Sequence, residues 1–313
     1  MRNMNKVLVI LGQTSTGKSD FAVEIAMHVD GEIISADSRQ VYKGMNLGTG
    51  KITKKEMRGV PHHLLDIYSP SKIFTVNEFQ KKANEIIKEI LAKGKVPIIC
   101  GGTGFYIDAV VDGNIFPEVK PNNKLREELS KKSVTELLKI LTKLDKVRAK
   151  NIDINNPVRL IRAIEIAKTL GSVPALKTNT DTNSAGAEFV SGGKFDVLKI
   201  GLTLPTEILK ERIKTRLLSR MKKGMIKEVE KLHESGTSWK RLNNLGLEYR
   251  YVALFLQKKL NKNEMIEKLY TDIWHFAKRQ KTWFKRDQNT IWIDPRKKSE
   301  KNRALKEIKR FLK

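Results

Sequence analysis

The stretch that decides the fold reads GQTSTGKS, from Gly12 to Ser19, and it fits the pattern G-x-x-x-x-G-K-[ST]. The apolar run Val7–Leu11 precedes it and helix-like apolar spacing follows it, which is the strand–loop–helix context of a phosphate loop. Glycines let backbone N–H groups approach an anion, and the N-terminus of the following helix adds partial positive charge. The residues expected to bind a chain of phosphates are Gly12, Gln13, Thr14, Ser15, Thr16, Gly17, Lys18 and Ser19.

Within this loop, Lys18 should reach phosphate oxygens and the Ser19 hydroxyl should help to hold Mg²⁺. The pattern does not say whether the phosphates belong to a nucleotide such as ATP or to another diphosphate. An ATPase usually has a second apolar strand that ends in an acidic residue, which helps to hold the metal. The candidate strand here, Val96–Cys100, runs into Gly101-Gly102-Thr103-Gly104 instead, which argues against ordinary nucleotide hydrolysis.

Strand-like and helix-like patterns alternate along much of the chain. Further apolar runs are Glu32–Ser35, Val96–Cys100, Phe195–Leu204 and Ile291–Ile293. Helical patterns follow Lys18, span Val76–Ala92, begin near Thr206 and occupy the lysine-rich tail. The alternation predicts an α/β fold in which helices flank a parallel sheet.

The character of the sequence changes after Pro117. Residues 123–170 read as lysine-rich helices, in which Asn156-Pro157 is a helix start and Gly171 a stop. Lys177–Lys194 is a polar segment that predicts a loop. We therefore expect an α/β core, formed by residues 1–117 and 190–313, that is interrupted by a helical insertion domain at residues 118–189.

The net charge of +26 is distributed unevenly. Residues 1–113 carry 15 basic and 12 acidic residues, whereas residues 114–313 carry 46 and 23. A polyanionic partner such as nucleic acid would explain a net charge of +23 in the second part. A solvated lysine-rich surface explains it equally well from charge alone.

Composition excludes several classes of protein. Cys100 is the only cysteine, so an intrachain disulfide or a cysteine-cluster metal site is impossible. No apolar run approaches the roughly 20 residues of a membrane span, and we expect a cytoplasmic protein without membrane contact. His62 and His63 are adjacent, so on a strand they would point in opposite directions, and we favour a structural loop over a metal pair.

Two other features carry chemistry. Asp37 and Ser38 follow an apolar strand, and in a parallel sheet ligands bind beyond the carboxyl ends of the strands. Asp37 should therefore lie near the phosphate loop, as a general base or as a simple turn cap. Arg212, Arg216 and Arg220 recur every four residues, which puts them on one face of a helix that is suited to phosphate contacts or to solvent.

The ordered motifs together resemble the bacterial tRNA dimethylallyltransferases, also called tRNA isopentenyltransferases. The resemblance spans residues 7–287 and rests on GQTSTGKS, ISADSRQVYKGMNLGT, PHHLLD, CGGTGFY, NPVRLIRAIE, ERIKTRLLSRMKKGMIKEV and AKRQKTWFKR. It implies a P-loop NTPase-like core with an inserted all-helical tRNA-binding domain. It also implies transfer of a dimethylallyl group from dimethylallyl diphosphate to the exocyclic amine of the adenine just 3′ of the anticodon.

The resemblance implies a role for each matching residue. The phosphate loop would hold the diphosphate, with Mg²⁺ as cofactor, and the catalytic residues would be Asp37, Thr103 and Arg216. Contacts to the anticodon stem-loop of tRNA would come from Asp37, Ser38, Arg39, Gln40, Thr103, Arg126, Val158, Arg159, Leu160, Ile161, Arg162, Gly246 and Arg250. The segment NNLGLEYRYV departs from the family's pattern at Glu248. A monomer is the expected state.

Three other functions fit part of the sequence. A P-loop kinase of small molecules would use Asp37 to activate a hydroxyl but would leave the basic region unexplained. A non-catalytic or ATP-driven RNA-binding protein would leave Asp37 unexplained. A related class of enzyme prenylates free adenine nucleotides and has less need of a basic insertion.

Overall fold

The computed structural model describes residues 5–114, 116–174 and 195–313, and the chain forms two compact units. The core unit comprises Met1–Gly113 and Val190–Lys313, and the helical unit comprises Asn114–Phe189. The loop predicted for Lys177–Lys194 and the predicted second boundary, between residues 189 and 190, lie outside the described residues.

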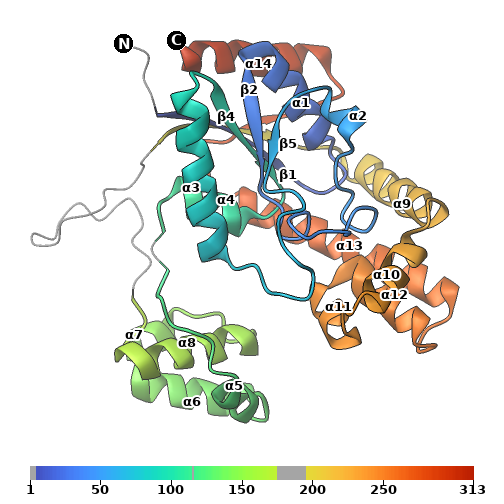
Figure 1. The fold of residues 1–313 in the computed structure, drawn as a ribbon. Helices are drawn as coiled ribbons and strands as arrows, with labels where there is room; N and C mark the ends of the chain where they lie inside the picture. The colour runs from blue at the N-terminus through green and yellow to red at the C-terminus, as the bar shows by residue number, and fades with distance from the viewer. Residues whose placement is uncertain (1–4, 115, 175–194) are drawn as a thin grey trace, which may run out of the picture. The chain divides into compact units, whose positions relative to one another are not determined.

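The core unit is built on a six-stranded sheet in the order β3-β2-β4-β1-β5-β6, and every pair of neighbours is parallel (Figure 1). The strands are β1 (Lys6–Gly12), β2 (Gly31–Ser35), β3 (His62–His63), β4 (Val96–Gly101), β5 (Asp196–Leu202) and β6 (Ile291–Ile293). β1 is central, with Ile10 opposite Cys100 of β4 and opposite Ile200 of β5.

Helices cover both faces of this sheet, because the side chains of a strand alternate between faces. Val7 and Val9 of β1 belong to one apolar core, together with side chains of α3, α4, α9, α10, α12 and α13. Leu8 and Ile10 belong to a second core with α1 and α14. The helices of this unit are α1 (Lys18–Val29), α2 (Lys54–Met57), α3 (Val76–Ala92), α4 (Gly104–Val111), α9 (Thr206–Lys222), α10 (Met225–Glu234), α11 (Trp239–Leu245), α12 (Leu247–Leu256), α13 (Lys262–Phe284) and α14 (Lys298–Leu312).

Glycines let the strand ends approach each other where the loops of the site begin. A Cβ on Gly12 would lie 2.4 Å from the carbonyl oxygen of Leu202, and Gly12 has φ 141°. A Cβ on Gly101 would lie 2.1 Å from the carbonyl oxygen of Ala36. Any side chain at either position would push neighbouring strand ends apart, so the carboxyl edge of the sheet depends on both glycines.

The helical unit contains α5 (Asn123–Ser130), α6 (Val134–Leu144), α7 (Lys146–Lys150) and α8 (Pro157–Leu170). Its apolar core comprises Leu129, Leu137, Leu141, Ala149, Ile152, Leu160, Ala163 and Ile164. α8 begins as the sequence predicts: the Asn156 side chain accepts a hydrogen bond from the Arg159 amide, and Pro157 is the first helical residue. It ends at Gly171, whose φ is 82°.

A buried carboxylate ties the helical unit together. Glu165 of α8 is 1% exposed and accepts hydrogen bonds from the Asn122 amide (2.6 Å), from Arg126 (2.7 and 3.0 Å) and from Arg162. Burial alone would raise the pKa of Glu165, but these hydrogen bonds outweigh it and hold the pKa below its usual value. The network joins the start of α5 to α8.

Replacing Glu165 by glutamine should therefore destabilise the fold by about 1–3 kcal/mol, because two half-exposed guanidinium groups lose their anionic partner. Since folding lowers the pKa of Glu165, its contribution is complete above its unfolded value and is lost as the pH falls below that value. Thermal unfolding of the variant at pH 7 checks this. Glu127→Gln, on the exposed side of α5, is the matched control. Equal melting temperatures for the two variants would contradict the prediction.

The α/β fold class and the parallel sheet predicted from the sequence are confirmed, as is the helix over Val76–Ala92. The loop predicted at His62-His63 is wrong, because the two residues form the short edge strand β3. His63 Nε2 lies 2.8 Å from Glu32 Oε2, and His62 Nδ1 lies 2.8 Å from the Val60 carbonyl. Two residues are too few to show strand periodicity, so the sequence did not reveal β3.

Among the described residues, no helix is long and apolar enough to cross a bilayer.

Candidate active site

The phosphate loop joins β1 to α1, and α13 holds it in place through hydrogen bonds. The Thr14 amide donates to Oε1 of Gln280 (2.8 Å), and Nε2 of Gln280 donates to the Gly102 carbonyl (2.8 Å). The side chain of Gln13 donates to the Ala277 carbonyl (3.0 Å). α13 thus fixes the phosphate loop and the glycine loop after β4 relative to each other.

Two residues of the phosphate loop adopt left-handed backbone conformations just before α1 begins. Gly17 has φ 92° and Ser15 has φ 62°, so both are in the left-handed region. Gly17 caps α1 without any side-chain hydrogen bond, which leaves the first amides of the helix available to an anion. An open helix N-terminus after a left-handed glycine is typical of a loop that binds phosphate.

Lys18 folds back over this loop. Its Nζ donates to the Gln13 carbonyl (2.6 Å), and its side chain is half-buried. Burial, together with the charge of Arg216, lowers the pKa of Lys18 to about 8, although Cys100 and Asp37 oppose the shift. An ammonium group with a depressed pKa and a single neutral partner would gain from a bound anion.

Ser19 is exposed on the first turn of α1, and its hydroxyl makes no hydrogen bond within the described part of the chain. Mg²⁺ is usually held by one or two protein oxygens, by substrate phosphates and by water. A single free hydroxyl beside the phosphate loop fits that pattern. Among the described residues, no cluster of three His, Cys, Asp or Glu side chains could hold a metal by itself.

Asp37 and Thr103 belong to loops that follow neighbouring strands, β2 and β4. The Ser38 amide donates to the Thr103 hydroxyl (3.2 Å), and the Thr103 amide donates to the Ala36 carbonyl (3.2 Å). Oδ1 of Asp37 accepts from the amides of Arg39 (2.8 Å) and Gln40 (3.3 Å). The turn-cap role and a reactive role are compatible, because Oδ2 of Asp37 makes no hydrogen bond with a described residue.

Arg216 of α9 completes the site. Its guanidinium donates to the Gly50 carbonyl (3.3 Å) and is half-buried. Burial and the neighbouring Arg220 lower the pKa of Arg216 to about 10, while Glu248 and Asp37 act in the opposite direction. Charge coupling of this kind links Lys18, Asp37 and Arg216, so the structure brings together three residues that lie far apart in the sequence.

The arginine stripe does not simply face solvent, since a Cβ on Gly17 of the phosphate loop would lie 3.9 Å from an Nη of Arg212. Arg212 is exposed, but Arg220 has a side chain only 12% exposed and donates to the Gly48 carbonyl (3.2 Å) and to Glu248 (3.1 Å). Burial raises the pKa of Glu248, and Arg220 opposes that rise. The departure from the family's pattern at Glu248 is thus a buried partner for Arg220.

Cys100 lies three residues before Thr103 in the chain and is buried beneath this site. Burial raises the pKa of its thiol to about 12, although nearby Lys18 opposes the shift. A thiol that stays protonated is a poor nucleophile, so Cys100 has a structural role.

The residues predicted to contact tRNA lie in three places. Ser38, Arg39 and Gln40 stand next to Asp37 in the core unit, and the Arg39 guanidinium donates to the Ser38 carbonyl (3.4 Å). Gly246 joins α11 to α12 with φ 77°, and exposed Arg250 donates to the Asn243 carbonyl (3.1 Å). The remainder belong to the helical unit: Arg126, Val158, Arg159, Leu160, Ile161 and Arg162.

Within the helical unit these residues differ in exposure. Val158 is 74% exposed, and exposed Arg159 pairs with Asp153 at 3.4 Å. Leu160 is fully buried in the apolar core, so its side chain contributes packing rather than a surface contact. Ile161 is half-buried, and Arg126 and Arg162 remain partly exposed while they pair with Glu165.

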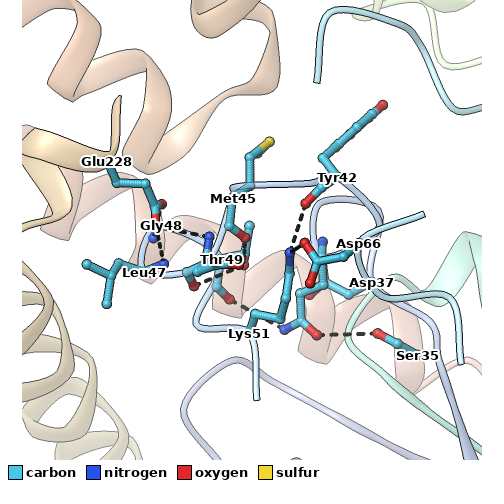
Figure 2. Close-up of polar contacts among 12 residues, drawn as sticks. Ser35, Asp37, Tyr42, Met45, Leu47, Gly48, Thr49, Lys51, Asp66 and Glu228 are labelled. Carbon is cyan, nitrogen blue, oxygen red and sulfur yellow. Dashed lines mark hydrogen bonds and ion pairs between the residues drawn. The ribbon is translucent and has the colours of Figure 1, made fainter. Parts of the chain in front are cut away.

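Sequence reasoning missed the residues that hold the site in place. Gln280 and Glu228 lie in motifs quoted for the family resemblance, and Gly50 directly follows another, but no pattern in these stretches assigns them a partner. Figure 2 shows the clearest case, in which Glu228 of α10 accepts hydrogen bonds from the amides of Leu47 and Gly48. Only contacts between distant segments reveal these roles.

Comparison with known proteins gives a consistent result. A family model described as IPP transferase matches residues 40–287. The tRNA dimethylallyltransferase 2 of Treponema denticola is 45% identical over 291 residues, which cover 92% of this chain and 94% of that protein. The tRNA dimethylallyltransferase of Lachnoclostridium phytofermentans is 38% identical over 313 residues, which cover 99% and 98%.

Solved structures agree. The tRNA isopentenylpyrophosphate transferase from Bacillus halodurans matches with a TM-score of 0.72 and 32% identity, covering 98% of this chain and 97% of that one. A eukaryotic dimethylallyltransferase acting on tRNA matches with a TM-score of 0.73 and 27% identity, covering 90% and 70%. This chain belongs to the IPP transferase family, the tRNA dimethylallyltransferases, which are enzymes that modify tRNA by prenylation.

Proposed function

We propose that this chain transfers the dimethylallyl group of dimethylallyl diphosphate to the exocyclic amine of the adenine 3′-adjacent to the anticodon in tRNA. The observation that carries the proposal is the meeting of Lys18, Asp37 and Arg216 at the carboxyl edge of the sheet. Two cations suit a departing diphosphate, and the neighbouring carboxylate suits a proton. β4 ends without an acidic residue, which fits a reaction that cleaves no γ-phosphate.

The leaving group would be held by the phosphate loop. Amides at the N-terminus of α1, the Lys18 ammonium and the Arg216 guanidinium would neutralise the charge that develops as the carbon–oxygen bond breaks. Mg²⁺, held by Ser19 and diphosphate oxygens, would supply further positive charge to the leaving group. The diphosphate keeps the electron pair of the broken bond, and the allylic carbon becomes electron-poor.

The acceptor would be activated from the opposite side of the pocket. The adenine amine forms the new carbon–nitrogen bond, and its surplus proton passes to the free Oδ2 of Asp37. The Thr103 hydroxyl would position the adenine amine relative to the diphosphate of the donor. An adenine stacked in a loop cannot reach the pocket, so it would be flipped out of the anticodon loop, as RNA loops permit.

The anticodon stem-loop of tRNA would be bound by residues of both units. Exposed Val158 and Arg159 of α8 and exposed Arg250 of α12 offer apolar and cationic contacts to bases and phosphates. A monomeric state and a cytoplasmic location, where tRNA is available, are part of the same proposal.

Labelled dimethylallyl diphosphate and Mg²⁺, offered with tRNA, AMP or ATP as acceptor, test the proposal directly. We expect label to move to tRNA alone, and an unmodified anticodon stem-loop of the same sequence to act as a minimal acceptor. Transfer to AMP instead of tRNA would identify a nucleotide prenyltransferase. Turnover of ATP without any prenyl transfer would favour a kinase or an ATP-driven RNA-binding protein.

A further inference from the structure

The segment 46–51, between β2 and α2, is held through its backbone by two charged side chains. Glu228 of α10 accepts hydrogen bonds from three consecutive amides: those of Asn46 (3.0 Å) and Leu47 (2.6 Å) on Oε2, and that of Gly48 (3.0 Å) on Oε1 (Figure 2). The Tyr249 hydroxyl also donates to Oε1 (2.8 Å). The carboxylate therefore accepts hydrogen bonds from four donors, which is the number that the lone pairs of its two oxygens can accommodate.

At its other end the segment is held by Lys51. Its Nζ donates to the Tyr42 carbonyl (2.8 Å) and to Asp66 (2.5 Å), as Figure 2 shows. Within the segment, the Thr49 hydroxyl donates to the Met45 carbonyl (2.7 Å). The backbone between these points is consequently fixed in position.

The carbonyl groups of the same segment receive the arginines of α9. Arg220 donates to the Gly48 carbonyl (3.2 Å), and Arg216 donates to the Gly50 carbonyl (3.3 Å). The fit is tight: a Cβ on Gly50 would lie 1.7 Å from an Nη of Arg220 and 2.2 Å from an Nη of Arg216. A small shift of the segment would therefore move both guanidinium groups.

We infer that Glu228 is a positioning residue, which sets the Arg216 guanidinium for the diphosphate by fixing the amides of 46–48 and thereby the Gly48 and Gly50 carbonyls. The inference rests on the proposed function, in which Arg216 holds the leaving group. Glu228 itself faces the segment and not the pocket, so it acts only through Arg216. Misplacement of a catalytic group by about 1 Å can lower the rate about 10²-fold.

Glu228→Gln is the sharpest test, because it keeps the shape of the side chain but puts an NH₂ group where an oxygen accepts from two donors. We expect the KM for dimethylallyl diphosphate to rise about tenfold, while the KM for tRNA stays within twofold of the wild type. Glu230→Gln is the matched control, since Glu230 lies on the exposed face of the same helix, and its KM for the donor should not change.

A double-mutant cycle with Arg216→Ala separates positioning from a general structural effect. In that background Glu228→Gln should leave the donor KM unchanged, because the residue through which it acts is gone. If the two effects multiply instead, or if Glu228→Gln raises the KM for tRNA and not for the donor, the inference is wrong. Should Glu228→Gln fail to fold, Glu228→Asp, which retains both oxygens, should show a smaller rise in donor KM, and an unchanged KM would overturn the inference.

Failure of the proposed function gives a different result. If Arg216→Ala alone does not change the donor KM, then Arg216 does not hold the diphosphate and the proposed function loses its support. If Arg216→Ala raises the donor KM but Glu228→Gln does not, only the positioning role of Glu228 is lost.

Discussion

Asp37→Asn should lower the rate of prenyl transfer by about 10²–10⁴-fold, the usual contribution of a general base, while tRNA affinity changes little. Asparagine keeps an oxygen for the Arg39 and Gln40 amides, so the turn after β2 survives. The group that replaces Oδ2 is an NH₂, which cannot accept a proton. The two functions of the side chain, as turn cap and as base, are thereby separated.

Single-turnover rates with saturating tRNA and donor measure this effect, and tRNA binding is followed separately. Asp196→Asn, at the exposed start of β5, is the matched control and should keep the wild-type rate. A variant that loses tRNA binding but transfers at the normal rate once tRNA is bound would show that Asp37 is a tRNA contact and not the base.

Removing either cation from the diphosphate pocket should have the second large effect. A hydrogen bond to a charged group contributes about 1.5–3 kcal/mol, so Lys18→Met and Arg216→Ala should each weaken affinity for dimethylallyl diphosphate by about 10–100-fold. The combined variant tests whether the two cations act on one leaving group. Lys214→Ala, at an exposed position of the same helix α9, is the matched control and should bind the donor normally. Unchanged donor affinity in both single variants would rule out the proposed pocket.

The affinity should also depend on pH in a way that identifies Lys18. Its pKa of about 8 means that the free enzyme loses this charge above pH 8, whereas Arg216, with a pKa of about 10, keeps its charge there. Donor affinity of the wild type should therefore fall above pH 8, and Lys18→Met should lack that inflection. Calorimetric titration with the donor from pH 6.5 to 9.5 measures both curves.

The same pKa has a consequence for stability. Because folding lowers the pKa of Lys18 from 10.5, the charged lysine opposes folding fully below pH 8, and the penalty disappears as the pH rises from 8 toward 10.5. Lys18→Met should consequently raise the melting temperature at pH 7 while it weakens donor binding. This loss of stability is expected if the ammonium group gains its anionic partner only when the proposed diphosphate binds.

Local sequence signals predict many of the secondary-structure elements of this protein. The phosphate loop, the strands Lys6–Gly12 and Ile291–Ile293, the helix Val76–Ala92 and the helix between Pro157 and Leu170 all follow from short-range signals. Turn chemistry, capping and apolar periodicity act over a few residues, so they can be read without knowledge of the fold. The position of Asp37 beyond a strand end also follows from the sheet topology alone.

Tertiary structure alone decided which charged side chains are part of the site and which hold the structure together. Arg220 is directed by Gly48 and Glu248, Gln280 ties the phosphate loop to Gly102, and Glu228 holds a segment about 180 residues away in the chain. No periodicity in the sequence encodes such pairings, because each hydrogen bond depends on two segments that meet only after the sheet and its helices have packed. A lysine-rich sequence is compatible with an anionic partner as well as with a solvated surface, and only the packed fold shows which cations remain available to such a partner.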